Sequence, residues 1–279
     1  MIGGFTIVKP KMDLELFVLT WGIYPRRILI YLAEKGLLKS PATEVTDSTP
    51  LEVQCQTFNL KINPVTVSAT ETSMELVAPG KPSGTVPILA IGNGTFVKQS
   101  IAILEYFEDI CEHASLQASE DGREDETYFR TMRGTTPEER ARTRDILALA
   151  DEASTFFGFA CHKGSSLFSN LESQSPMASV MALEWCRRAL EKIEVVYEDD
   201  HRFEVLPGTR NSGNRSNIAD CVLFSLLQFS KELYGRDLII GLPNLEGFYE
   251  LFKERDSAKI PENWYPAHIE SMAKVWLAE

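Results

Sequence analysis

A proline in the first half of the chain opens an apolar run in a way that could present backbone groups to a ligand. The run Gly84–Leu89 reads Gly-Thr-Val-Pro-Ile-Leu. Because proline cannot donate a hydrogen bond to a sheet, it belongs at a sheet edge or beside a site. A cis Val86–Pro87 bond would turn the chain sharply and point the backbone amide and carbonyl of Val86 outward, but such bonds are rare and sequence alone does not establish one.

A second pair, Gln99 and Ser100, stands where a helix is expected to begin. A helix N-terminus carries exposed amides and a partial positive charge, and a serine hydroxyl there can also donate a hydrogen bond. This combination is typical of a carboxylate-binding site. Serine is also a common helix N-cap, so Ser100 taken alone fits either role.

The elements around these residues are a strand, a helix, a hairpin and a second helix. Leu14–Leu19 is apolar and predicts a buried strand, and a helix is expected from Pro25 to a stop at Gly36. Val86–Ile91 and Thr95–Lys98 flank an Asn-Gly pair, which is the strongest short hairpin signal. From Ser100 onward, apolar residues recur at intervals of three and four and predict a helix.

The stretch between the first helix and the hairpin is less regular. Leu60–Val67 alternates weakly and suggests a second strand, whereas Ser40–Phe58 has no clear period and its structure stays open.

The second half of the chain predicts helices only. A capping box begins a long helix that runs from Thr136 to about Phe159. Further helices are expected from Ser175-Pro176, with Trp185 on the inner face, from Asn217 to Tyr234, at Leu245–Glu254 and at Pro266–Leu277. Short connections between such helices make an α-bundle. The expected domains are therefore residues 1–112 and 136–279, joined by an acidic linker at 113–135.

The order of these strings resembles the glutathione S-transferase family. The parallels are TWGIYPRRILIYLAEKGL after the first strand, GTVPIL, NGTFVKQSIAILEY and, in the second half, NIAD. The resemblance implies an α/β thioredoxin-like N-terminal domain and an all-α C-terminal helical bundle. The first and third of these sequence segments are most similar to fungal members of the family, some of which belong to polyketide biosynthetic pathways.

The resemblance also implies roles for individual residues. In the family, the residue before the cis-proline pairs through its backbone with the cysteinyl unit of glutathione. The resemblance assigns this role to Val86 and Pro87 and predicts that the bond between them is cis. The Glu/Gln-Ser pair holds the γ-glutamyl group, which assigns it to Gln99 and Ser100. Lys81 could reach the glycyl carboxylate, although an exposed lysine in such a loop often has no role. Asn217 and Asp220 match a helix-capping motif that is structural.

Thiol activation is where this sequence departs from the family. A free thiol titrates near pH 8.5, so an enzyme must stabilise the thiolate with a hydroxyl donor and a helix N-terminus. Gly22 stands where serine-type members carry their serine. Tyr24, at the start of the first helix, is the first candidate for the missing hydroxyl and Thr20 the second. Tyr24 could instead pack at the domain interface.

The acceptor site is expected between the two domains. Trp21 and Ile23 would line it from the first domain, and Phe156 and Phe157 from the long helix, where Phe159 also lies. Such a site would take an apolar, aromatic substrate. An aromatic cluster at helical spacing is also a common core feature.

The composition of the chain limits the kinds of molecule to which it is expected to bind. The net charge of −12 disfavours nucleic acid, and the apolar runs are too short to cross a bilayer. The N-terminus does not resemble a signal peptide, so a cytoplasmic location is expected. The five cysteines and four histidines are dispersed, which predicts no metal and no disulfide framework.

Two classes of function remain. The first is an enzyme that adds the thiol of glutathione to an apolar electrophile; isomerisation and elimination could use the same site. The second is a non-catalytic module that binds glutathione. A thioredoxin-type oxidoreductase is disfavoured because the sequence has no C-x-x-C. The resemblance implies a homodimer.

Overall fold

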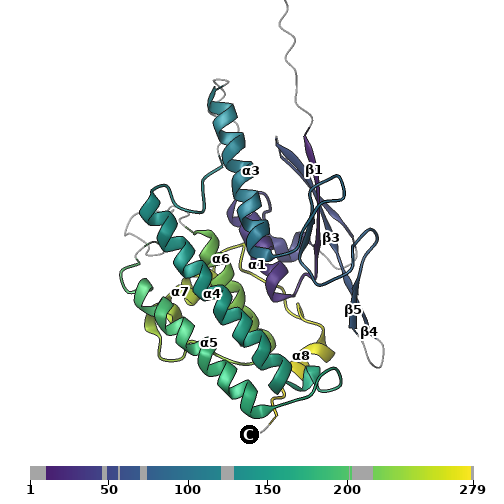
Figure 1. Ribbon diagram of the computed structural model, residues 1–279, viewed down its shortest axis with the longest axis vertical. Coiled ribbons are helices and arrows are strands. Elements are labelled where there is room, and N and C mark those ends of the chain that lie inside the picture. Colours follow the sequence, from purple (N-terminus) through teal and green to yellow (C-terminus); the bar gives the residue numbers. More distant parts are fainter. Residues whose placement is uncertain are drawn as a thin grey trace, which may run out of the picture.

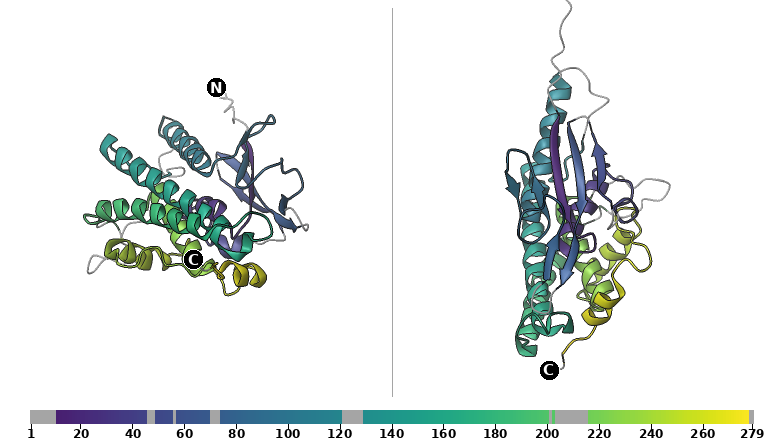
Figure 2. Two further views of the ribbon diagram at one scale, coloured as in Figure 1. Left: turned by 60° about the horizontal axis from the view of Figure 1, so that its bottom comes forward. Right: turned by 90° about the vertical axis from the view of Figure 1, so that its right-hand side faces the viewer.

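The computed structural model describes residues 11–45, 49–55, 57–69, 74–120, 129–200, 202 and 216–277. A small mixed sheet lies on one side, two helices cover the face of the sheet that looks inward, and a group of further helices packs beyond them (Figure 1). The second pair of views shows the sheet on the outside and the helical part behind it (Figure 2).

The sheet has five strands in the order β2-β3-β1-β6-β7. These are β1 (Met12–Val18), β2 (Leu51–Gln54), β3 (Phe58–Pro64), β6 (Ile88–Ala90) and β7 (Phe96–Val97). The β1 strand pairs parallel with β3 and antiparallel with β6. With α1 (Ile23–Glu34) and α3 (Ser100–Glu120), this is the expected thioredoxin-like domain.

Alternation along β1 builds two packing surfaces. Leu14, Leu16 and Val18 join the main core, whereas Phe17 faces the other side of the sheet. There it forms a small cluster with Val65, Val86 and Ile88. This cluster anchors the side chain of Val86 immediately before β6.

The stretch that had no clear period contains α2 (Pro41–Glu44) and β2. The expected strand Leu60–Val67 is divided instead of continuous, because β3 ends at Pro64. The following residues form a separate hairpin of β4 (Thr66–Ala69) and β5 (Met74–Val77).

Two turns confirm their sequence signals. Gly36 adopts φ +80° after α1, and the amide of Leu37 donates to the carbonyl of Leu32. Between β6 and β7, Asn93 and Gly94 have φ values of 50° and 73°, which only the left-handed region supplies and which Asn-Gly favours.

The helical part comprises α4 (Pro137–Gly164), α5 (Pro176–Tyr197), α6 (Ile218–Gln228), α7 (Pro243–Lys253) and α8 (Ala267–Ala273). Capping boxes begin α4 and α6, as the sequence predicts. All residues of α6 are buried, and the helix packs against both α1 and α4. It therefore joins the helical part to the first domain.

Two helices differ from their expected extents or faces. The α3 helix continues to Glu120, so residues 113–120 of the expected linker are helical, while residues 121–128 of the acidic segment lie outside the described residues. On α5 the buried face includes Ala182, Cys186 and Ala189. The prediction that Trp185 lies on the inner face is wrong, because its side chain is 47% exposed at the edge of that face. Among the described helices, none has both the length and the apolar composition that a bilayer requires.

Candidate functional site

The N-terminus of α1 has no side-chain cap. Gly22 occupies the N-cap position, and its carbonyl accepts from the amide of Arg26. Pro25 has no amide hydrogen, so the first turn offers the amides of Ile23 and Tyr24. Without a capping hydroxyl, the positive end of the helix relies on backbone groups alone.

The Val86–Pro87 peptide bond is cis, which confirms the prediction. The Val86 side chain is 8% exposed within the cluster around Phe17. Packing therefore fixes this residue at the entry to β6, which itself pairs with β1. 

Ser100 is the first residue of α3 and is buried, while Gln99 before it is exposed. The backbone carbonyl of Gln99 accepts from the amide of Ile103 and so begins the helix. The hydroxyl oxygen of Ser100 accepts a hydrogen bond from Nη1 of Arg27 at 3.0 Å. Because its oxygen is engaged as an acceptor, the hydroxyl proton is directed elsewhere and can donate.

Arg27 is the centre of this arrangement. Its side chain is fully buried, and Nη1 also donates to Asp151 of α4 at 2.6 Å. The guanidinium lies 4.6 Å from the centroid of the Tyr24 ring. Its Nε and Nη2 atoms are buried and have no hydrogen-bond partner among the described residues. Burial lowers the pKa of the guanidinium, and the charge of Asp151 opposes this shift.

The hydroxyl of Tyr24 lies against α4 and not in open solvent. The Thr155 side chain lies beside it, and a Cβ placed on Gly158 would lie 3.9 Å from it. The Thr155 hydroxyl donates to the backbone carbonyl of Asp151 at 3.0 Å. Burial raises the pKa of Tyr24, so the phenol stays protonated. The protonated phenol can therefore act as a hydrogen-bond donor.

The other predicted residues are placed as follows. Thr20 is buried at the end of β1, and Trp21 and Ile23 are half-buried and pack against the main core. The side chain of Lys81 folds back, and Nζ donates to the carbonyls of Pro82 at 3.0 Å and Gly84 at 2.7 Å. Burial and the nearby Lys98 lower the pKa of Lys81.

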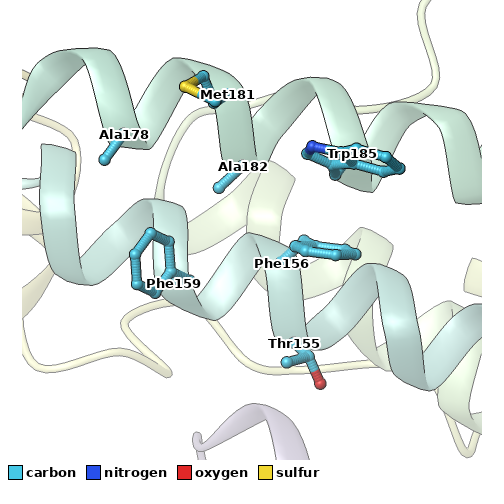
Figure 3. Close-up of a pocket in the computed structure, with 7 residues that line it drawn as sticks. All are labelled: Thr155, Phe156, Phe159, Ala178, Met181, Ala182 and Trp185. Atoms are coloured by element: carbon cyan, nitrogen blue, oxygen red, sulfur yellow. The ribbon is translucent and has the colours of Figure 1, made fainter.

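The aromatic residues of α4 separate into two environments. Phe157 is fully buried in the core and packs edge-on against Tyr234, so the expectation that it lines an acceptor site is wrong. Phe156 and Phe159 line a groove of about 360 Å³ between α4 and α5 (Figure 3). The groove lies between two helices of the same domain, not between the domains.

The described residues contain no group of three His, Cys, Asp or Glu side chains arranged to hold a metal ion.

Residues 21–110 match the sequence model of the glutathione S-transferase N-terminal domain. Solved structures extend this likeness across both domains. The fold is that of the glutathione S-transferases. A glutathione transferase family member from Pseudomonas fluorescens with bound glutathione is 18% identical, with a TM-score of 0.58, over 89% of this chain and 99% of that one. A glutathione S-transferase from Methylobacillus flagellatus with glutathione bound is 18% identical, with a TM-score of 0.57, over 88% and 96%.

Gtt2 from Saccharomyces cerevisiae is 19% identical, with a TM-score of 0.53, over 88% of this chain and 98% of that one. No curated protein matches the chain by sequence.

Within this fold, Arg27 joins residues that the sequence analysis treated separately. It connects Ser100 of α3 and Tyr24 of α1 with Asp151 of the helical part. Neither Arg27 nor Asp151 was predicted from the sequence as a site residue. A signal was available, because Arg26 and Arg27 lie directly before the apolar run Ile28–Ile30, and charged residues on a core-facing helix are uncommon unless paired.

Proposed function

We propose that the protein is a glutathione-dependent transferase that acts on an apolar electrophile. The observation that carries this proposal is the meeting of the α1 and α3 N-termini through Arg27, with Ser100 buried at the junction. Both helix N-termini favour negative charge: the start of α3 would hold a carboxylate, and the start of α1 would hold a thiolate. The bound glutathione in the two bacterial structures supports it.

The γ-glutamyl group would bind at the start of α3. Because Ser100 accepts from Arg27, its proton is available for the ligand carboxylate, and the helix amides add their partial charge. The exposed side chain of Gln99 would accept from the ammonium group. The backbone of Val86 would pair with the cysteinyl unit, as an added strand pairs with a sheet edge. The Lys81 side chain would have to break its hydrogen bonds to the carbonyls of Pro82 and Gly84 before it could reach the glycyl carboxylate.

The thiol would lie at the uncapped N-terminus of α1. Its amides and dipole favour the thiolate, which attacks the electrophilic carbon. A carbon–sulfur bond forms, the leaving group departs with its bonding electrons, and the thiol proton goes to solvent. Tyr24 would donate a hydrogen bond to the sulfur, and Thr20 is the alternative donor.

Thermal unfolding with glutathione tests the proposal. A ligand at 100 times its dissociation constant stabilises the native state by about 2.7 kcal/mol. Glutathione and S-methylglutathione should both raise the midpoint, because the γ-glutamyl site is common to them. Ser100→Ala should reduce the shift, whereas Ser115→Ala, farther along the same helix, should not. The absence of any shift with either ligand would refute the proposal.

A non-catalytic glutathione-binding module is the second candidate. It is favoured by Gly22 at the helix cap and by the position of the Tyr24 hydroxyl against Thr155 of α4. This candidate predicts that bound glutathione keeps an ordinary thiol pKa, whereas the transferase predicts a lowered one. Thiolate absorbance near neutral pH distinguishes them. A lowered pKa with no conjugate formed would favour an isomerase or lyase on the same site.

We also propose a homodimer, a cytoplasmic location and a role in fungal secondary metabolism. The homodimer and the metabolic role rest on the sequence resemblance. Sedimentation velocity tests the first, and imaging of the tagged chain in its own cell tests the second. Comparison of secondary metabolites with and without the gene tests the third.

A further inference from the structure

Two adjacent arginines near the start of α1 differ in how their charges are balanced. Arg26 and Arg27 are both buried, with 4% and 0% of their surfaces exposed. Arg27 forms an ion pair with Asp151 of α4 at 2.6 Å. The guanidinium of Arg26 instead points toward α6, which packs directly against α1 (Figure 1). The start of α1 therefore holds two buried cations, and only one of them is paired with a carboxylate among the described residues.

The hydrogen-bond partners of Arg26 are neutral. Its Nε donates to Oε1 of Gln228 at 3.2 Å, and its Nη2 donates to the carbonyl of Ala258 at 2.8 Å. Nη1 is buried and has no hydrogen-bond partner within the part of the chain that the structure describes. Bonds to neutral oxygens hold the guanidinium in place, but they leave its positive charge uncompensated.

Two titratable side chains face Arg26 from the helical part. They are Tyr265 and Glu232, which lies on the π-helical turn η2 (Phe229–Leu233) directly after α6. Burial raises the pKa of both, so Tyr265 is neutral and Glu232 is ionised less completely than an exposed glutamate. Burial also lowers the pKa of Arg26, but only to about 10, so the guanidinium is protonated at neutral pH. The charge on Arg26 is therefore at most partly balanced from this side.

The position of this charge is unfavourable for the helix and favourable for an anion. The amide of Arg26 donates to the carbonyl of Gly22 at 2.9 Å and so closes the first turn of α1. The N-terminus of a helix already carries a partial positive charge, which a cation in the same turn repels and an anion attracts. A buried charge acts through a medium of low dielectric constant and is screened little by salt. The proposed thiol site lies at this N-terminus.

We propose that Arg26 is a positioning residue that stabilises the thiolate of bound glutathione through its uncompensated charge. It does so without touching the sulfur, because its side chain is turned toward α6 and Ala258. Arg27 contributes less, since its charge is balanced by Asp151. Arg26 thus supplies part of the stabilisation that a serine would supply at Gly22. This inference rests on the proposed transferase function.

Two variants change the charge at this position in different ways. Arg26→Met removes the guanidinium and keeps most of its apolar stem. Gln228→Glu keeps Arg26 and places a carboxylate where the amide oxygen now accepts from Nε. Thiolate absorbance across pH 5–10, measured on the full chain with glutathione bound, should show that each variant raises the thiol pKa by about 1 unit.

Controls separate the charge from glutathione binding and from charge in general. S-methylglutathione, which has no thiol, should bind to wild type and to both variants with affinities within about twofold of one another. Arg236→Met removes an exposed cation that stacks on Trp276 in the helical part, and it should leave the thiol pKa unchanged. Glu232→Gln removes the acid that faces Arg26, so it should not raise the thiol pKa.

An unchanged thiol pKa in either variant would overturn the inference. If it is already lowered in wild type, the proposed function would remain and the α1 amides and hydroxyls would carry the effect. If Arg26→Met does not fold, Gln228→Glu decides alone, because it keeps Arg26 and its hydrogen bond. An ordinary thiol pKa in a wild-type protein that binds S-methylglutathione would remove the transferase function and this role together. No binding of S-methylglutathione to wild type would remove the glutathione site itself.

Discussion

Removing the buried charge of Arg27 should cost less stability than removing its partner Asp151. In the folded protein the guanidinium has no exposed surface, and only Nη1 has hydrogen-bond partners among the described residues. Arg27→Met keeps the apolar stem and removes the whole charged group. Asp151→Ala leaves that group buried with Ser100 as its remaining hydrogen-bond partner.

The magnitudes follow from these contacts. Arg27→Met loses an ion pair to an acid that is 42% exposed, worth about 1 kcal/mol or less, and a charged hydrogen bond worth about 1.5–3 kcal/mol. It also removes two unpartnered buried donor atoms, each of which costs about 1–3 kcal/mol. The free energy of unfolding should therefore fall by no more than about 2 kcal/mol. Asp151→Ala should lower it by about 2–4 kcal/mol, because a buried charge loses its counter-ion.

Urea unfolding followed by circular dichroism and by tryptophan fluorescence measures these values, and coincident transitions check the two-state assumption. Glu152→Ala, at an exposed neighbouring position on α4, is the control and should stay within about 0.5 kcal/mol. In the double variant, Asp151→Ala should cost little beyond Arg27→Met, since its buried partner is gone. If Arg27→Met were the more damaging single change, Nε and Nη2 must be satisfied in solution and the reasoning fails.

Three further results are expected. Ser100→Ala should weaken glutathione about tenfold and also lower the unfolding free energy by about 1 kcal/mol, because its hydroxyl serves both the ligand and Arg27; titration calorimetry and urea unfolding measure the two effects. Gly22→Ser should lower the pKa of bound glutathione, read by thiolate absorbance, at a stability change below about 1 kcal/mol. The backbone φ of −74° suits serine, although its Cβ would lie a tight 3.3 Å from Leu19 O and Pro25 Cδ. Lys81→Ala should weaken glutathione about threefold or less, since its ammonium is already satisfied by two carbonyls.

Local signals predicted the elements that they encode directly. The Asn93-Gly94 turn, the capping boxes at Thr136 and Asn217 and the stop at Gly36 each depend on the conformational preference of one or two residues. The cis bond before Pro87 came from the family resemblance together with the position of the proline, and the structure confirms it.

Features that depend on contacts between distant residues were not predictable in this way. Phe156 and Phe157 are adjacent in sequence, and only the packing of α4 against α5 and Tyr234 decides which one is exposed to a ligand. Arg27 and Asp151 lie 124 positions apart, so no local pattern connects them. The surroundings of the Tyr24 hydroxyl could not be predicted for the same reason, because its neighbour Thr155 lies far away in sequence, on α4.

The neighbouring Thr155 affects whether Tyr24 can donate a hydrogen bond to the thiol of glutathione. The phenol stays protonated, because burial raises its pKa, and it therefore has one proton to donate at any pH at which the thiol ionises. The neighbouring Thr155 hydroxyl donates to the Asp151 carbonyl, and its oxygen could accept the phenol proton in competition with a ligand sulfur. If Tyr24 activates glutathione, Thr155→Val should free the phenol for the sulfur, lower the thiol pKa and leave glutathione affinity unchanged. Tyr24→Phe should raise the thiol pKa and reduce turnover more than affinity, since the interaction is made mainly with the anion.

The two variants together separate activation from packing. A packing role for Tyr24 predicts that Tyr24→Phe changes neither the thiol pKa nor turnover, because the ring and its contact with Arg27 remain. It also predicts that Thr155→Val has no effect on the thiol. Thiolate absorbance across pH 5–10 in both variants provides the measurement, and the double variant should match Tyr24→Phe alone. Equal pKa values in wild type and Tyr24→Phe would exclude Tyr24 from activation, and the α1 amides, with Thr20 as the remaining hydroxyl, would then have to stabilise the thiolate.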